Sequence, residues 1–188
     1  MSDPQATHPE VVFDHQQVQQ ILQDLAQRLA ERHRNCGELV LVGIRTGGAH
    51  LARRLQGLLE DLTGASPDTG IMDITLYRDD WTLSHSRPKL GRTEIPFSIE
   101  NRVVVLVDDV LYTGRTARAA LDALIDFGRP RRIELLVLVD RGHRELPIQP
   151  DYVGAVVKTS QDEIIDVLLA EEGHPRDQVL KKKRSQRA

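Results

Sequence analysis

The chain has 188 residues and a formal net charge of −3. That length fits one domain with one sizeable core, and the slightly acidic charge argues against bulk electrostatic binding to nucleic acid. A single cysteine, Cys36, excludes an intrachain disulfide and a cysteine cluster for metal, which is typical of a reducing compartment. No apolar stretch approaches the roughly 20 residues of a membrane span, and no signal-peptide pattern begins the chain. We therefore expect a cytoplasmic protein with no membrane partner.

The first half of the chain predicts an arm followed by alternating helices and strands. Residues 1–10 are rich in polar residues and proline, which predicts a flexible N-terminal arm. Apolar residues at helical spacing predict a helix from Asp14 to His33, with Asp14 as its N-cap. The pattern then predicts a buried strand over 39–44, a glycine turn, a helix over 49–62 and a strand over 71–77.

The second half continues the alternation after a long irregular segment. Residues 79–96 lack periodicity, which is typical of a functional lid or a mobile loop. The pattern then predicts strands over 103–107, 133–139, 152–157 and 164–169, with a helix over 117–127 that ends at Gly128. A basic run ends the chain, so we expect a single domain over 11–170 and a disordered basic tail over 171–188. Alternating strands and helices predict an α/β fold with a parallel sheet.

The most informative motif is the run from Val104 to Thr116. Its apolar strand delivers Asp108 and Asp109 to the strand's carboxyl end, where open α/β sheets bind ligands. The residues from Thr113 to Thr116 follow as a loop whose amides and hydroxyls can surround a phosphate at a helix N-terminus. The motif therefore predicts a site for a phosphorylated sugar.

Other classes with carboxylates at strand ends fit this pattern less well. A receiver-type phosphoacceptor protein has its paired acids near the chain start. A haloacid-dehalogenase phosphatase needs two aspartates separated by one residue, and Val110 stands in the second place. The chain contains neither a Walker A triplet nor a Gly-x-Gly-x-x-Gly fingerprint. A solvated acidic turn would explain neither the phosphate-loop residues nor their spacing.

The run from Val104 to Thr116 resembles the phosphoribosyl pyrophosphate (PRPP) motif of type I phosphoribosyltransferases. Three longer segments, over 73–80, 109–116 and 139–148, resemble the PyrR family, whose members combine uracil phosphoribosyltransferase activity with RNA-binding control of pyrimidine operons. The resemblance covers about residues 11–160. It implies the type I phosphoribosyltransferase fold, a central mostly parallel sheet flanked by helices, with a small hood and a flexible loop.

The resemblance implies that uracil and PRPP are converted to UMP and pyrophosphate. It makes Asp108 and Asp109 the catalytic residues, which bind the ribose hydroxyls and stabilise an oxocarbenium-like ribose. Magnesium would be held mainly by PRPP, pyrophosphate and water, so no residue is predicted as a metal ligand. With the two aspartates, the implied PRPP-binding residues are Arg45, Thr46, Gly47, Val110, Leu111, Tyr112, Thr113, Gly114, Arg115 and Thr116.

Uracil recognition is implied for the segment that follows the next strand. Backbone groups and the side chain of Arg141 are expected to read the base, together with Asp140 and Gly142, while Ile165 on a later strand covers it. The flexible loop, which would exclude water from the site, is implied for Arg78, Asp79 and Asp80.

The chain also departs from the family pattern. Gly47 stands where family members often carry arginine, so the pyrophosphate loop lacks a cation. On the first helix, Gln23, Asp24 and Gln27 stand where an RNA-binding member commonly has threonine, arginine and histidine. Losing such cations weakens contacts with RNA phosphates. A leader mRNA is thus a candidate partner only, and three alternatives stay open: a uracil transferase, an RNA-binding regulator with weak transferase activity, and transfer to another base such as a purine. The resemblance also implies a homo-oligomer of two or more chains.

Overall fold

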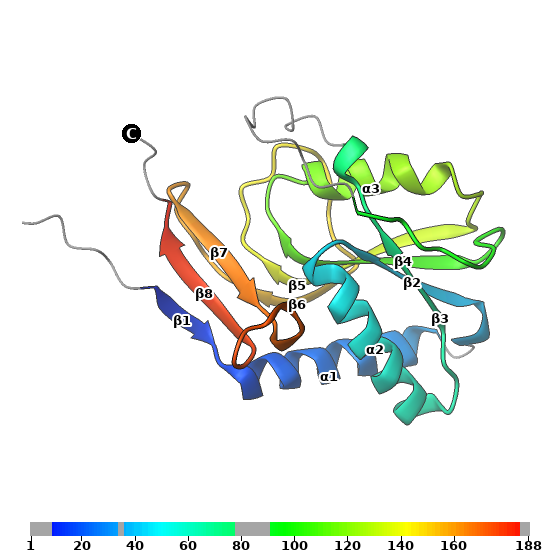
Figure 1. The fold of residues 1–188 in the computed structure, drawn as a ribbon, viewed down its shortest axis with the longest axis horizontal. Helices are drawn as coiled ribbons and strands as arrows, with labels where there is room; N and C mark the ends of the chain where they lie inside the picture. Colours follow the sequence, from blue (N-terminus) through cyan, green and yellow to red (C-terminus); the bar gives the residue numbers. More distant parts are fainter. Residues whose placement is uncertain (1–8, 34–35, 78–90, 185–188) are drawn as a thin grey trace, which may run out of the picture.

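The computed structural model describes residues 9–33, 36–77 and 91–184. Its central sheet has five parallel strands in the order β3-β2-β4-β5-β6 (Figure 1). The strands are β2 (Leu39–Ile44), β3 (Asp68–Met72), β4 (Val103–Leu111), β5 (Arg132–Asp140) and β6 (Tyr152–Val156). Because every neighbouring pair is parallel, the carboxyl ends of all five strands lie at one edge of the sheet. The predicted α/β fold is confirmed.

Helices cover both faces of this sheet. The described residues form α1 (His15–Arg32), α2 (Gly47–Thr63) and α3 (Arg115–Ile125). Helices α1 and α2 pack on one face and α3 on the other (Figure 1). Along β4, Val103, Val105 and Val107 join the core under α1 and α2, whereas Val104 and Leu106 join the core under α3. Buried residues on both faces explain why the strands read as continuous apolar runs.

The predicted start of the first helix is confirmed in detail. The Asp14 side chain accepts the amide of Gln17 at 2.9 Å, and the Gln17 side chain accepts the amide of Asp14 at 2.9 Å. This reciprocal capping box satisfies two amides that would otherwise have no partner in the helix. Helix α2 starts two residues earlier than predicted, because the glycine turn itself forms its first turn.

The strand predicted over 71–77 is only partly correct. Strand β3 ends at Met72, and Thr75–Tyr77 form a 3-10 turn, η2. The carboxylate of Asp73 accepts the amide of Thr75 at 2.8 Å and also its hydroxyl. Such a local side-chain bond offers the backbone an alternative to the sheet ladder. The predicted flexible-loop residues Arg78, Asp79 and Asp80 lie outside the described residues.

A second, small antiparallel sheet corrects the predicted ends of the domain. It has the order β1-β8-β7 and consists of β1 (Glu10–Phe13), β8 (Gln178–Lys183) and β7 (Glu163–Leu168). The prediction of a disordered tail over 171–188 is therefore wrong for the strand β8, and the predicted arm over 1–10 overlaps the first residue of β1.

The basic tail forms a strand because its residues find partners in distant parts of the chain. Val179 is fully buried in the core, Lys181 lies 2.8 Å from the carboxylate of Glu10, and Lys182 pairs with Asp166. The strand thus buries an apolar residue at its start and pairs its lysines with acids on β1 and β7. A run of like charges suggested disorder only because these partners are distant in sequence.

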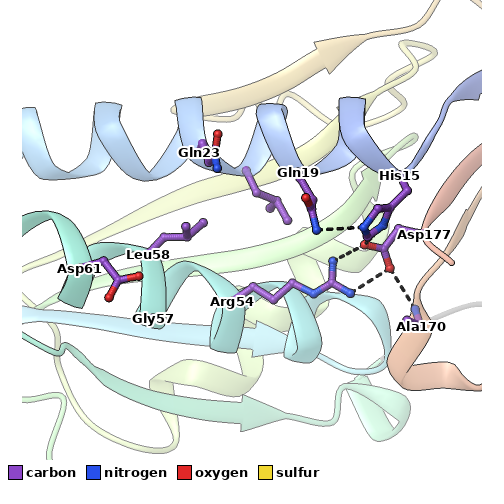
Figure 2. Close-up of a pocket in the computed structure, with 10 residues that line it drawn as sticks. His15, Gln19, Gln23, Arg54, Gly57, Leu58, Asp61, Ala170 and Asp177 are labelled. Atoms are coloured by element: carbon purple, nitrogen blue, oxygen red, sulfur yellow. Dashed lines mark hydrogen bonds and ion pairs between the residues drawn. The ribbon is translucent and has the colours of Figure 1, made fainter.

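A polar cluster joins the segment before β8 to the two helices (Figure 2). The carboxylate of Asp177, which is 1 % exposed, accepts bonds from Arg54 at 2.6 and 2.9 Å and from the amide of Ala170 at 3.0 Å. The Nδ1 atom of His15 lies 3.2 Å away. The cluster lines a hollow of about 460 Å³ between α1 and α2. The bonds from Arg54 lower the pKa of Asp177 despite its burial. Among the described residues, no helix is long and apolar enough to cross a membrane.

Candidate active site

Strand β4 places the two adjacent carboxylates at the carboxyl edge of the sheet. Apolar residues bury the strand as far as Val107, and Asp108 is still only 6 % exposed. The Asp108 side chain accepts the amide of Asp109 at 3.0 Å, and the Asp109 side chain accepts the amide of Val110 at 2.7 Å. These local bonds fix both carboxylates at the point where a ligand would meet the sheet.

The environment of Asp109 shifts its pKa. Burial raises the pKa of Asp109, the amide of Val110 opposes that rise, and the negative charge of Asp166 on β7 adds to it. The net direction is upward, so Asp109 keeps its proton to higher pH than an ordinary aspartate does. A bound ligand with positive charge would reverse this shift.

The predicted phosphate loop leads into α3. Gly114 is the residue before the helix and has φ +91°, a left-handed conformation that glycine adopts without strain. The Thr113 hydroxyl accepts the amide of Arg115 at 3.4 Å, and the Thr113 carbonyl accepts the amides of Glu145 and Leu146 at 3.0 and 3.1 Å. The helix N-terminus, which favours anions, therefore follows the acid pair within one supported loop.

The predicted pyrophosphate loop touches the acid pair. A Cβ atom added to Gly47 would lie 2.6 Å from Oδ2 of Asp109, and one added to Gly48 would collide with the carbonyl oxygen of Val107. Position 48 therefore requires glycine, because its neighbour is backbone, whereas a side chain at position 47 would need the Asp109 carboxylate to move. The first turn of α2 lies directly against the end of β4. Two loops from different parts of the sequence form one continuous surface.

Arg45 stands beside this surface at the end of β2. Its Nη2 atom lies 3.4 Å from the carbonyl of Arg92, and its amide donates to the carbonyl of Met72 at 2.9 Å. The Arg45–Thr46 peptide bond is cis, and both side chains are exposed. An exposed cation next to the glycine turn remains available to a charged ligand.

Strand β5 brings the predicted base-recognition segment to the same edge. The Asp140 carboxylate accepts the amide of Gly142 at 2.9 Å and pairs with Arg144. Burial alone would raise the pKa of Asp140, but the bonds from Arg144 and Gly142 together lower it. Because β5 is the direct neighbour of β4, this segment lies beside the acid pair.

The side chain of Arg141, which is predicted to read the base, is bonded to other segments of the chain. It is 5 % exposed, and its Nε atom donates to the Thr159 hydroxyl at 3.2 Å. Its Nη2 atom donates to the carbonyls of Ser160, at 3.3 Å, and Glu163. The guanidinium also lies over the Tyr112 ring, 4.0 Å from the centroid. The guanidinium thus points to neighbouring chain segments, a role that its position after a strand did not reveal.

The structure brings most of the predicted residues together. Arg45, Asp108 and Asp140 lie at the carboxyl ends of three adjacent strands, β2, β4 and β5, and so at one edge of the sheet. Strand β7 contacts β4, and its Ile165 packs against the same core cluster as Val110. Sequence reasoning gave no role to Asp73, Thr159 or Asp166. Only Asp73 lay inside a motif segment that could have indicated it.

Comparison with known proteins agrees with this geometry. Residues 10–172 match the phosphoribosyl transferase domain family. A hypoxanthine phosphoribosyltransferase structure from Trypanosoma cruzi superposes with a TM-score of 0.69 at 18% identity, covering 93% of this chain and 96% of that one. One from Staphylococcus aureus gives 0.64 at 23% identity, covering 85% of each. These likenesses show the fold, and with the domain match they place the chain among the type I phosphoribosyltransferases.

Closer relatives narrow the family. The Bifunctional protein PyrR of Desulfosudis oleivorans is 54% identical over 161 residues, which are 85% of this chain and 89% of that protein. The Bifunctional protein PyrR of Geobacter sulfurreducens is 53% identical over 172 residues, 92% of this chain and 97% of that protein. The chain belongs to the PyrR family, and the resemblance drawn from its motifs is confirmed.

Proposed function

We propose that this protein is a uracil phosphoribosyltransferase, which converts uracil and PRPP to UMP and pyrophosphate. The observation that supports this best is the meeting of the acid pair, the phosphate loop and the Asp140–Gly142 segment at one sheet edge. Membership of the PyrR family supports uracil as the base.

The acid pair acts on the ribose. In the transfer, the bond from C1 to the pyrophosphate oxygen breaks and a bond from C1 to N1 of uracil forms, while the N1 proton passes to solvent. Positive charge develops on the ribose as pyrophosphate departs. Asp108 and Asp109 accept bonds from the ribose hydroxyls and stabilise this charge, an effect that is strong where water is excluded. A developing cation beside Asp109 also favours ionisation of its carboxyl group.

The two phosphate groups have separate sites in this proposal. The loop from Tyr112 to Thr116 binds the 5′-phosphate through its amides, its hydroxyls and the positive end of α3. The turn from Arg45 to Gly47 binds pyrophosphate, where the exposed Arg45 supplies a cation that Gly47 does not. The flexible loop predicted at Arg78, Asp79 and Asp80 excludes water from the reacting ribose.

The residues at the edge of the sheet fit a magnesium ion that is held mainly by oxygens of PRPP, pyrophosphate and water. The described residues contain no group of three or more His, Cys, Asp or Glu that could hold a metal. Asp108 and Asp109 offer hard oxygen donors, so they would hold magnesium only together with oxygens of PRPP, pyrophosphate and water. When bound, the ion neutralises charge on the departing pyrophosphate.

The base distinguishes this proposal from purine transfer. The hypoxanthine phosphoribosyltransferases share only the fold, at 18–23% identity. We expect the backbone beside Asp140 and Gly142 to bind the carbonyl and imide groups of uracil beneath Ile165. Incubation with PRPP, magnesium and each base in turn tests this. Formation of UMP with no IMP supports the proposal, and IMP formed from hypoxanthine with comparable efficiency refutes it.

UMP-dependent binding to a pyrimidine-operon leader mRNA is the second candidate function. Family membership favours it, while the exposed positions 23, 24 and 27 of α1 carry no cation: Asp24 accepts a bond from Gln20 at 2.9 Å, and Gln27 donates to Glu31 at 3.0 Å. Binding of the leader RNA should be measured with and without UMP across salt concentrations. Sequence-specific binding enhanced by UMP would support regulation, whereas a plain salt slope without UMP dependence would contradict it.

Sedimentation of the same preparation tests the predicted homo-oligomer.

A further inference from the structure

Arg141 is a buried cation whose bonds lead to a neighbouring chain segment. Arginine is almost never fully buried unless it is paired. Here the guanidinium donates to the hydroxyl of Thr159 and to the backbone carbonyls of Ser160 and Glu163. The Thr159 hydroxyl in turn lies 3.2 Å from the carbonyl oxygen of Arg141. Residues 159–163, which we name the β7 lead segment, are thus bound to Arg141 from several sides.

The same guanidinium contacts the proposed phosphate loop. It lies over the ring of Tyr112 at 4.0 Å, a geometry in which a cation is attracted to the ring face. His143, two residues after Arg141, also connects the β7 lead segment to Tyr112. The Nε2 atom of His143 lies 2.7 Å from the carbonyl of Thr159, and its ring meets the Tyr112 ring edge-on with centroids 6.0 Å apart. Two side chains therefore join the β7 lead segment to Tyr112.

The β7 lead segment runs into the start of β7. Glu163 is the first residue of β7, and Ile165 and Asp166 lie two and three positions further along it. Ile165 is the proposed cover of the base, and the charge of Asp166 reaches Asp109. Strand β7 also pairs with β8, so the lead segment adds a second attachment at the end of β7 that is nearest to both groups.

We propose that Arg141 is a positioning residue for base binding, which fastens the β7 lead segment to the phosphate loop and so holds the base cover in place. The inference rests on the proposed uracil transfer and adds a role that is distinct from reading the base. The base cover and the 5′-phosphate site are connected through one guanidinium. Arg141 thereby influences uracil affinity without contacting uracil through its Nε and Nη2 atoms.

The phosphate loop has supports of its own besides Arg141. Its Thr113 carbonyl accepts the amides of Glu145 and Leu146, and its Tyr112 carbonyl accepts Nη1 of Arg144 at 3.0 Å. These bonds remain when Arg141 is replaced. Removal of the guanidinium should therefore disturb base binding much more than binding of PRPP.

The test compares Arg141→Gln and Arg141→Lys with the unaltered full chain in the presence of magnesium. We expect Arg141→Gln to raise KM for uracil about tenfold while KM for PRPP changes less than about twofold. Arg141→Lys should give a smaller rise than Arg141→Gln, because lysine keeps the positive charge. It should still raise KM for uracil, because one ammonium cannot reproduce the planar fork that bonds three oxygens. Thr159→Val, which removes one of these partners, should raise KM for uracil in the same direction.

Arg28→Gln is the matched control. Arg28 also lies over a tyrosine ring, that of Tyr152 at 5.7 Å, and donates to the carbonyl of Val153 at 2.9 Å. It belongs to α1, and its ring contact and hydrogen bond among the described residues both go to β6. Its replacement should leave both KM values unchanged, so an equal rise in this variant would overturn the inference.

Ligand binding separates this inference from the proposed function. Calorimetry with UMP and with ribose 5-phosphate needs no turnover; Arg141→Gln should weaken UMP about tenfold and leave ribose 5-phosphate unchanged. Unchanged UMP affinity, or equal weakening of both ligands together with a lowered Tm, would overturn the positioning role. Failure of the unaltered chain to make UMP would instead refute the proposed function. If Arg141→Gln does not fold, Arg141→Lys and Thr159→Val decide the question by the same measurements.

Discussion

At the residue scale, the contact between Gly47 and Asp109 links the pyrophosphate loop to the acid pair. A Cβ atom at position 47 would come within 2.6 Å of Oδ2 of Asp109, so the carboxylate in its present place depends on glycine there. Position 47 therefore bears on the site in two ways: it lacks the cation of the family pattern, and it leaves room for the Asp109 carboxylate. Both effects should be visible in kinetics with PRPP.

Gly47→Ala tests this contact. The added Cβ would lie 2.6 Å from Oδ2 of Asp109, so the carboxylate must move. We expect kcat/KM for PRPP to fall about tenfold, because small displacements of reacting groups are costly. Gly57→Ala is the control: nothing lies within 4 Å of its Cβ position in α2. That change should leave kinetics unaltered and stabilise the protein by roughly 0.5–1 kcal/mol. Unchanged kinetics in Gly47→Ala would contradict the contact's importance.

Asp109→Asn should abolish turnover and yet increase stability at neutral pH. Burial raises the pKa of Asp109 above its ordinary 3.8, so the folded state binds more protons than the unfolded state between the two values. The free energy of unfolding therefore falls as pH rises through this window, and the penalty persists at pH 7. The amide variant keeps an oxygen for the Val110 amide but carries no charge. Urea unfolding at pH 4 and pH 7 should show that its advantage grows with pH, and a constant difference would contradict the raised pKa.

At the element scale, the attachment of the C-terminal segment depends on Asp177. Asp177→Asn removes a buried charge paired with Arg54 and should destabilise the protein by about 3 kcal/mol. Because the bonds from Arg54 lower the pKa of Asp177, its contribution is present above the ordinary aspartate pKa and is lost as pH falls through the folded value. Urea unfolding from pH 7 downward should show the deficit of the variant shrinking. Asp61→Asn, at an exposed position in the same hollow, serves as the control and should change stability little.

Elements with local signals could be predicted from the sequence, and those with distant partners could not. The capping pair of Asp14 and Gln17 and the apolar run of β4 are local, so α1 and the central strand were located correctly. The pairing of Glu10 with Lys181 joins the two ends of the chain, so nothing near the basic tail indicated a strand. In the site, the apolar run before Asp108 and Asp109 was enough to predict that both lie at the carboxyl end of a strand. The orientation of Arg141 depends on Tyr112 and on residues 159–163, which are distant in sequence.

At the scale of the whole molecule, a sheet shared with other phosphoribosyltransferases is combined with segments at the strand ends that differ between them. The central sheet is shared with hypoxanthine phosphoribosyltransferases at 18–23% identity, so the sheet alone cannot select the base. We propose that selection depends on the segment after β5 and on β7, which the small sheet holds beside β4. The basic tail is part of that small sheet, so on this proposal it contributes to the position of the base cover.

Uracil transfer is tested by product formation from PRPP, magnesium and labelled uracil, with the full chain beside the double variant Asp108→Asn with Asp109→Asn. We expect UMP and pyrophosphate in equal amounts from the unaltered chain. We also expect at least about a hundredfold loss of kcat in the double variant, because the charge that stabilises the ribose cation is gone. Absence of UMP from the unaltered chain, or undiminished turnover by the double variant, would contradict this expectation.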